Sequence, residues 1–299
     1  MRSDWKASRA FSLVELLCAL LLGSAVIGTA LAVLAGSIRS YEQVLALSEA
    51  RRRGQMALQL FVYAIENAGL GIPGETVSFR DSLSVGTASL NSLLGWEGPV
   101  STSANELRLV YAVPTTLVNA SLSTETLPSA DRSVRLSGPV PEAQIQAWSG
   151  FGPTSTRSWV LFPPSEVPFL VRRVTNQTLT VRSSRPSWIA SNARLHFLRA
   201  LRARVISLPG QEPVLCTEDL TSGSGLQERV IGIVGFRPEY DPQTRTLTLA
   251  VLSRGGSRHP NSVSPAFLAG WPGRIPEEER CYVLAVSSRA WRIRNGGAP

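Results

Sequence analysis

Residues 10–38, with the sequence AFSLVELLCALLLGSAVIGTALAVLAGSI, decide how this chain is organised. From Leu16 to Ile38 they include 23 residues without a charge. As a helix this run would extend about 34 Å, enough to cross the hydrocarbon core of a bilayer. Three basic residues precede it: Arg2, Lys6 and Arg9. Basic residues on this side predict a cytoplasmic N-terminus and export of the chain that follows.

One carboxylate, Glu15, stands directly before the uncharged run. An unpaired acid costs roughly 2.5–3.5 kcal/mol at mid-membrane and less near the surface. A secretory signal peptide is one interpretation, but the apolar run is longer than a usual signal core and no small-x-small cleavage site follows it. A plain signal anchor is another interpretation, and it leaves Glu15 unexplained. We therefore expect a positively charged partner for Glu15.

The residues AFSLVELL at positions 10–17 resemble the class III signal of type IV pilins and type II secretion pseudopilins. The resemblance implies that residues 1–10 are a leader, which a prepilin peptidase removes between Ala10 and Phe11. It also implies methylation of the new amine of Phe11. The residue before the cut is usually glycine in that family, and here it is Ala10.

The same resemblance supplies a partner for Glu15. After cleavage the α-amino group of Phe11 is a cation at a helix start, one turn from the carboxylate. The two can pair within one chain or between neighbouring subunits, and the helix dipole also favours the acid there. In a bundle of such helices a matched pair selects one axial register. Residues 11–38 would then anchor the protein in the inner membrane, and later hold it in a pilus or periplasmic pseudopilus with other pilins or pseudopilins, through an inner-membrane assembly platform.

The helical pattern continues past the membrane segment. Apolar residues at helical spacing extend from Ile38 through Tyr41 and Leu45, so residues 39–70 are predicted to be an exposed second half of the helix. The glycine- and proline-rich run at 69–74 predicts its end. The preceding sequence ALQLFVYAIENAGLGIPG also resembles the large minor-pilin subfamily called PilW and the type II secretion minor pseudopilin J.

Residues 75–299 predict a β-rich extracytoplasmic head, with a candidate insertion at 76–155, and hence an α+β fold in which a long helix packs on an antiparallel head. The composition, 43% hydrophobic and 17% charged, excludes wholesale disorder. The clearest hairpin turns at residues 240–244. The expected strands are Glu106–Val113, Trp159–Phe162, Phe169–Val174, Thr178–Arg182, Leu195–Leu198, Val230–Phe236, Thr246–Leu252 and Cys281–Val286.

Positive charge is concentrated in the second half of the chain. Residues 151–299 carry nineteen basic and ten acidic residues, whereas residues 1–150 are almost balanced. One stretch holds eight arginines and no acid: Arg172, Arg173, Arg182, Arg185, Arg194, Arg199, Arg202 and Arg204. Arginines near an aromatic such as Trp188 can hold phosphates and stack on bases, which makes this stretch a candidate DNA contact. The alternative is that these arginines face solvent or pair with acids elsewhere.

The sequence offers little for catalysis. His196 and His259 stand in a predicted strand and a predicted loop, and no Cys, His or carboxylate spacing indicates a metal site. No nucleophile elbow, Walker loop or dinucleotide fingerprint is present. We therefore expect neither an enzyme nor a cofactor. Cys216 and Cys281 form a candidate disulfide if the head lies outside the cytoplasm, with two separate thiols as the alternative.

These observations predict a minor pilin that primes or caps a type IV pilus and supports adhesion, twitching motility or DNA uptake. A minor pseudopilin of a type II secretion system is the alternative within the same family. A signal-anchored envelope protein that binds a ligand through its head is the alternative from another class.

Overall fold

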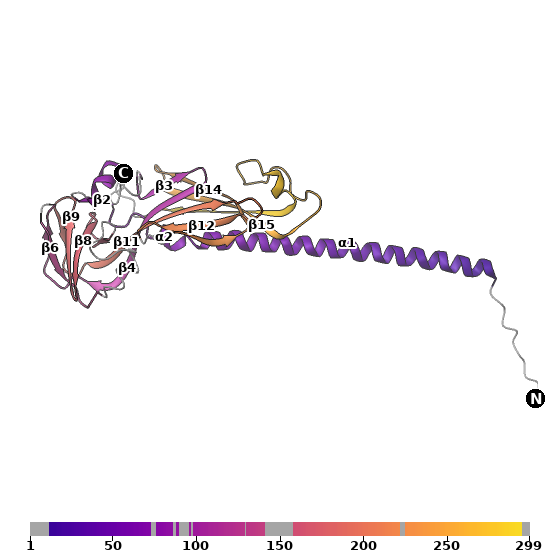
Figure 1. Ribbon diagram of the computed structural model, residues 1–299, viewed down its shortest axis with the longest axis horizontal. Coiled ribbons are helices and arrows are strands. Elements are labelled where there is room, and N and C mark those ends of the chain that lie inside the picture. The colour runs from indigo at the N-terminus through magenta and orange to yellow at the C-terminus, as the bar shows by residue number, and fades with distance from the viewer. Residues whose placement is uncertain are drawn as a thin grey trace, which may run out of the picture.

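A computed structural model describes residues 12–72, 76–85, 88–89, 96, 98–128, 130–140, 158–221 and 225–294. Its dominant element is helix α1 (Leu13–Gln59), which extends far beyond the head toward the N-terminus (Figure 1). A short break at Leu60 and Phe61 separates it from helix α2 (Val62–Glu66). Ala10 and Phe11, the predicted cleavage site, lie outside the described residues.

The predicted helix end agrees with the structure as far as residue 72. Gly69 and Gly71 adopt φ values of 72° and 66°, in the left-handed region that ends helices. The amide of Gly69 donates to the carbonyl of Val110 at 3.1 Å, and Ala68 forms a β-bridge with Tyr111. The chain therefore leaves the helix directly alongside a strand of the head.

The head is built around a nine-stranded antiparallel sheet. Its order is β13-β12-β11-β7-β8-β9-β6, with β4 also paired to β11 and β3 to β4. The strands are β3 (Val100–Ser103), β4 (Glu106–Val118), β6 (Arg132–Arg135), β7 (Trp159–Leu161), β8 (Phe169–Thr175), β9 (Thr178–Ser183), β11 (Arg194–Ile206), β12 (Val214–Asp219) and β13 (Leu226–Ile231).

A second antiparallel sheet, β14-β15-β16, is formed by the C-terminal part of the chain. It consists of β14 (Ile233–Asp241), β15 (Thr246–Arg258) and β16 (Tyr282–Arg292), with the 3-10 helix η1 (Glu277–Glu279) before β16. The predicted hairpin is confirmed: Asp241 accepts hydrogen bonds from the Gln243 amide at 2.9 Å and the Thr244 hydroxyl at 2.7 Å. Smaller elements are α3 (Thr76–Ser82) and the strand pairs β1 (Ser84–Val85) with β2 (Ala88–Ser89) and β5 (Thr124–Thr126) with β10 (Ser187–Ile189).

Small residues line the side of α1 that contacts the C-terminal sheet. Ala46, Ala50, Gly54 and Ala57 are buried, and their spacing of three and four residues places them on one helix face. A Cβ atom at Gly255 of β15 would lie 2.6 Å from the Ala46 carbonyl oxygen. Helix and strand backbones therefore approach each other more closely than larger side chains would permit.

The largest hydrophobic cluster lies between the helices and both sheets. Phe61, at the break between α1 and α2, is fully buried and stacks on Phe236 of β14 with ring centroids 5.6 Å apart. Leu109 of β4 and Leu215 of β12 join the same cluster from the nine-stranded sheet. Apolar side chains from three parts of the chain thus form one core at the C-terminal end of the helix.

The α+β class is confirmed: the chain has one long apolar N-terminal helix and mostly antiparallel sheets. The single strand predicted at Val230–Phe236 is wrong, because Gly232, with φ of 80°, divides it into β13 and β14 of different sheets. The prediction also missed β12, which pairs with β11 from Ile206 to Leu201. Within the predicted insertion at 76–155, strand β4 pairs with β11 in the main sheet, so this part is integral to the head.

Candidate functional site

Glu15 takes part in a capping box at the start of α1. Its Oε2 atom accepts a hydrogen bond from the Ser12 amide at 2.9 Å, and the Ser12 hydroxyl accepts one from the Glu15 amide at 3.2 Å. The two bonds satisfy backbone donors that a helix start leaves free. We did not predict this role from the sequence, although the pattern Ser-x-x-Glu before an apolar run is its signature.

The capping box leaves part of the carboxylate available. Among the described residues, Oε2 of Glu15 has a hydrogen-bond partner, and Oε1 has none. Oε2 already contacts the amide nitrogen of Ser12, and the residue before Ser12 is Phe11. An amine created at Phe11 by cleavage would therefore be only one residue away from that nitrogen. One carboxylate can therefore cap the helix through one oxygen and meet a cation through the other.

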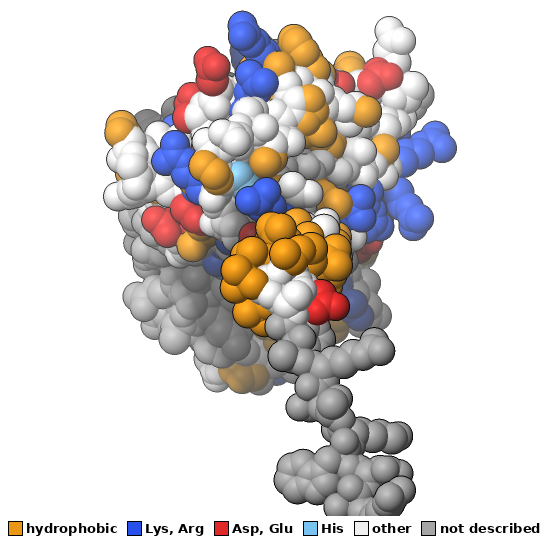
Figure 2. Space-filling model, turned by 90° about the vertical axis from the view of Figure 1, so that its right-hand side faces the viewer, with side chains coloured by type: hydrophobic (Ala, Val, Ile, Leu, Met, Phe, Trp, Pro, Cys, Tyr) orange, Lys and Arg blue, Asp and Glu red, His pale blue; other side chains and the backbone are white. Residues whose placement is uncertain are grey.

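The first half of α1 is apolar and uncovered. By length and composition alone the helix is long and apolar enough to cross a membrane. None of its most apolar stretch is buried inside the protein. Viewed along the helix from its N-terminal end, hydrophobic side chains surround the helix (Figure 2). Leu20, Leu21 and Leu22 in this segment are all exposed. Side chains of this kind need lipid or other helices around them.

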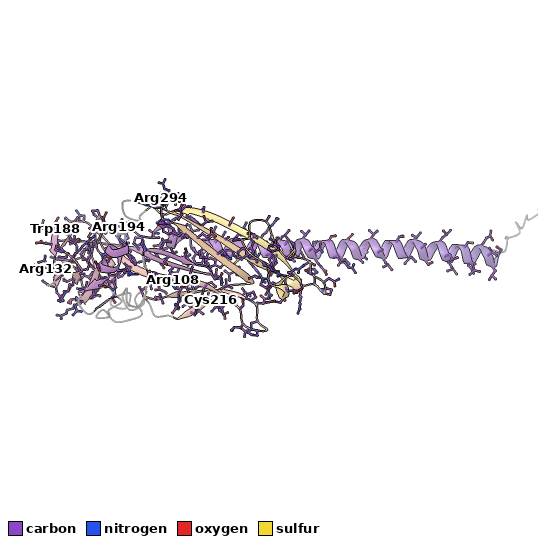
Figure 3. All side chains as sticks on the ribbon, turned by 90° about the horizontal axis from the view of Figure 1, so that it is seen from above. Arg108, Arg132, Trp188, Arg194, Cys216 and Arg294 are labelled. Carbon is purple, nitrogen blue, oxygen red and sulfur yellow. The ribbon has the colours of Figure 1, made fainter. Side chains whose placement is uncertain are left out.

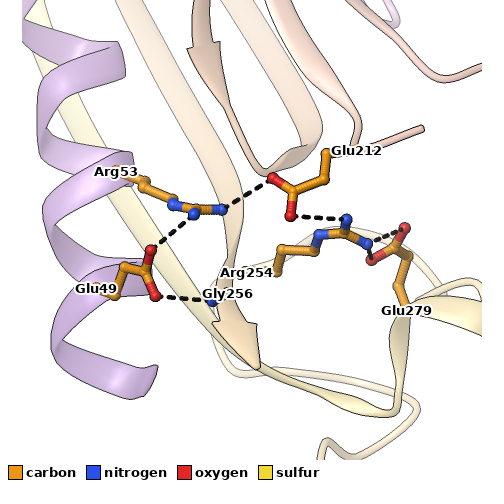
Figure 4. A network of polar contacts seen from close by, with 6 residues as sticks. All are labelled: Glu49, Arg53, Glu212, Arg254, Gly256 and Glu279. Carbon is orange, nitrogen blue, oxygen red and sulfur yellow. Dashed lines mark hydrogen bonds and ion pairs between the residues drawn. The ribbon is translucent and has the colours of Figure 1, made fainter. Parts of the chain in front are cut away.

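A polar network joins the second half of α1 to the head (Figure 4). Glu49 accepts a hydrogen bond from the Gly256 amide at 2.8 Å and pairs with Arg53 at 2.7 Å. Arg53 also pairs with Glu212 at 3.5 Å, in the connection between β11 and β12. These contacts connect the helix to both sheets.

The network continues into the C-terminal sheet. Arg254 of β15 is buried, pairs with Glu279 of η1 at 2.9 Å and reaches Glu212 at 3.6 Å. Its guanidinium carbon also lies 4.1 Å from the ring centroid of Tyr282. The Gly256 hydrogen bond, followed by the charge of Arg53, holds the pKa of Glu49 below its usual range. The charged form of Glu49 is thus part of the helix contact.

The eight arginines of the candidate DNA contact are divided. Arg182 pairs with Asp131, Arg199 with Asp219 and Arg202 with Glu218. Arg199 and Arg202 lie three positions apart on β11, and an odd separation places them on opposite faces of the sheet. This matches the alternative in which arginines pair with acids elsewhere.

The other five arginines differ in exposure. Arg172, Arg173, Arg185 and Arg194 are exposed, and Arg204 has a buried Nε atom without a hydrogen-bond partner among the described residues. Trp188 and Arg194 lie in the half of the head away from the protruding helix (Figure 3). Trp188 is 60% exposed and lies opposite Glu125 in the β10–β5 pair.

The candidate disulfide is not formed. Cys216 is a buried free thiol on β12 of the nine-stranded sheet, and Cys281 is a free thiol in the turn just before β16 of the C-terminal sheet. Their sulfur atoms donate locally, to the carbonyls of Val214 and Glu278. Sequence spacing does not reveal this, because it does not show which strands pair.

His196 has a structural environment on β11. Its Nδ1 atom lies 3.0 Å from the Arg194 carbonyl oxygen, and burial lowers its pKa. Within the described part of the chain, no group of three His, Cys, Asp or Glu residues is arranged to hold a metal ion.

Comparisons with protein-family models, with curated proteins and with solved structures gave no match to this chain. The functional argument therefore rests on the sequence and on the geometry described above.

Proposed function

We propose that this chain is a minor pilin, a structural subunit that enters a type IV pilus through its N-terminal helix and primes or caps the filament. The observation that carries the proposal is the carboxylate of Glu15, held by Ser12 at the free start of a long, uncovered apolar helix. A membrane anchor needs the apolar run but not the acid.

Removal of residues 1–10 would place a new amine at Phe11. In an apolar bundle, the free oxygen of Glu15 would pair with that amine in the same chain or with the amine of a neighbour. Mispaired charges in such surroundings are costly, so the pair favours one axial register of the helices. Prepilin peptidase and an inner-membrane assembly platform are the partners that this pathway requires.

The head supports a minor rather than a major role. Two sheets of nine and three strands make it bulky, and a bulky head is difficult to repeat along a filament. The network from Glu49 to Glu279 fastens both sheets to the helix, so that a helix inserted into a filament carries the head in a defined position.

Two other functions stay under test. A minor pseudopilin of a type II secretion system would use the same helix and the same acid, and the gene neighbourhood separates it from a pilus subunit. A signal-anchored envelope binding protein would use the helix only as an anchor. We do not extend the proposal to DNA, because three of the eight arginines pair with acids. Two of these three, Arg199 and Arg202, also lie on opposite faces of the sheet.

Substitutions at Glu15 and Ser12 separate charge pairing from helix capping. Glu15→Gln keeps an oxygen that can accept the Ser12 hydrogen bond but removes the charge, whereas Ser12→Ala weakens the cap and keeps the charge. We expect Glu15→Gln to be processed and membrane-inserted but missing from filaments, and Ser12→Ala to be incorporated. Immunoblots of sheared filaments and of membranes from a strain lacking the native gene measure both.

The same strains test cleavage. N-terminal sequencing of the mature protein should begin at methylated Phe11. Incorporation of Glu15→Gln at the level of the unsubstituted protein, or a mature protein that retains residues 1–10, contradicts the proposal and favours the simple anchor.

A further inference from the structure

A pocket of about 390 Å³ lies on the face of the C-terminal sheet that points away from the hydrophobic core. Phe236 and Leu249 point from this sheet into the main core. Side chains alternate along a strand, so Arg237 and Glu239 of β14 point to the other face of the sheet. Thr248 of β15 and Ser288 of β16 lie on this same outward face. The pocket is thus separate from the helix and from the polar network.

The wall of the pocket is the segment Gly270–Trp271–Pro272, which folds back over the sheet. The indole of Trp271 lies against Gly235 of β14, where a Cβ atom would overlap the ring. Leu268 and Ile275 on either side pack with Leu252 in a small hydrophobic cluster. Trp271 is therefore fixed in place on rigid elements beside the outward-facing polar groups.

Two hydrogen-bond donors point to one small space. A Cβ atom at Gly273 would be 3.7 Å from Arg237 Nη2 and 3.7 Å from Trp271 Nε1, and glycine leaves that space open. Among the described residues, the side chains of Arg237, Glu239 and Trp271 have no hydrogen-bond or ion-pair partner, and the hydroxyls of Thr248 and Ser288 have none either. The pocket thus combines an aromatic ring with free donors and acceptors.

We propose that this pocket binds a neutral saccharide. The guanidinium only donates hydrogen bonds and the carboxylate only accepts them, whereas a sugar hydroxyl does both. A polyhydroxyl ligand can therefore satisfy Arg237 and Glu239 together. Because Arg237 and Glu239 carry opposite charges, the pocket has no net preference for an anion or a cation. The exposed part of the Trp271 ring would contact the apolar C–H face of a sugar ring.

The proposal goes beyond filament assembly, and its test does not depend on filaments. The full chain is placed in lipid nanodiscs without glycolipid or sugar-based detergent. Cellotetraose and chitotetraose, whose β-linked rings have flat C–H faces, serve as probes in saturation-transfer NMR and titration calorimetry. We expect saturation transfer to the ring C–H protons of at least one probe.

Matched variants locate the binding. Trp271→Ala should abolish saturation transfer, and Glu239→Gln, at an exposed side chain, should weaken affinity about tenfold, as expected for a lost charge-assisted hydrogen bond. Trp188→Ala removes another exposed tryptophan in a distant part of the head and should leave binding unchanged. Circular dichroism checks that each variant remains folded.

Three results overturn the proposal. The first is absence of saturation transfer with both probes. The second is equal loss in Trp188→Ala and Trp271→Ala. The third is binding of polygalacturonate alone, strengthened by Glu239→Gln, which would identify an anionic ligand instead.

Discussion

Glu15 and Tyr111 show how local surroundings give a side chain its role. Glu15 caps a helix through one oxygen and, among the described residues, has no partner at the other. Tyr111 of β4 lies beneath the end of the helix, in edge contact with Tyr63 at 6.3 Å between ring centroids. Burial, with a further contribution from Asp219, raises the pKa of Tyr111 to about 12. Between pH 10 and 12, Tyr111 therefore remains neutral in the folded protein, whereas it ionises in the unfolded chain.

This shift predicts a specific alkaline instability. Below pH 10 both states are neutral at Tyr111, and the stabilisation is complete. As pH rises from 10 toward 12 only the unfolded state ionises, so the free energy of unfolding falls. Tyr111→Phe should remove this part of the pH dependence, and denaturant unfolding at pH 9, 10.5 and 11.5 measures it. Equal slopes for both proteins would show that Tyr111 is not the responsible group.

At the scale of elements, the contact between α1 and β15 depends on close backbone approach. The Ser253 hydroxyl donates to the Ala50 carbonyl at 2.6 Å, and Gly255 faces Ala46. Four small residues along α1 form the helix side of this contact. The opposite side keeps larger residues exposed, such as Tyr41 and Met56. One helix thus presents a small-residue face to its own head and an apolar face outward.

A methyl group at Gly255 should disturb this contact. We expect Gly255→Ala to lower the free energy of unfolding by about 1–3 kcal/mol, because the new atom meets the Ala46 backbone, which has little room to move. Gly36→Ala is the matched control, since no atom lies within 4 Å of a Cβ there. Denaturant titration followed by tryptophan fluorescence compares them. A stabilised Gly255→Ala would contradict the close packing.

At the scale of the whole molecule, one polar network determines how the helix and the two sheets are joined. Arg254 is its centre, because it contacts Glu212 in the connection between β11 and β12 and Glu279 beside the C-terminal sheet. Its side chain is 7% exposed and that of Glu279 is 13% exposed. Removal of one partner leaves the other charge buried without compensation.

Arg254→Ala should therefore cost about 3–5 kcal/mol of stability, far more than an exposed ion pair. The double variant Arg254→Met with Glu279→Gln removes both charges and should recover most of the loss. Arg274 is an exposed arginine in the connection between β15 and β16, and Arg274→Ala is expected to leave the stability unchanged. Thermal unfolding of the four proteins measures the differences. A neutral Arg254→Ala would show that the network does not hold the parts together.

Local pattern alone was enough to predict several elements. The apolar run from Leu16 to Ile38 and the breakers after Ala68 define the long helix, because helical periodicity and glycine act over neighbouring residues. The β14–β15 hairpin was predictable for the same reason, since its turn and alternation lie within one short stretch. The capping box of Ser12 and Glu15 was also predictable, because both residues lie within one turn of the helix start.

Only the tertiary structure decided which distant residues meet. The sequence showed eight arginines near one another, but three of them pair with acids from other parts of the chain. It showed the candidate pair Cys216 and Cys281, and the structure leaves both as free thiols, one on β12 and one in the turn before β16. The pocket around Trp271 unites residues of three strands and a loop. Helices and turns follow from contacts between near neighbours, whereas ion pairs, thiol separation and pockets depend on strand register across long stretches of chain.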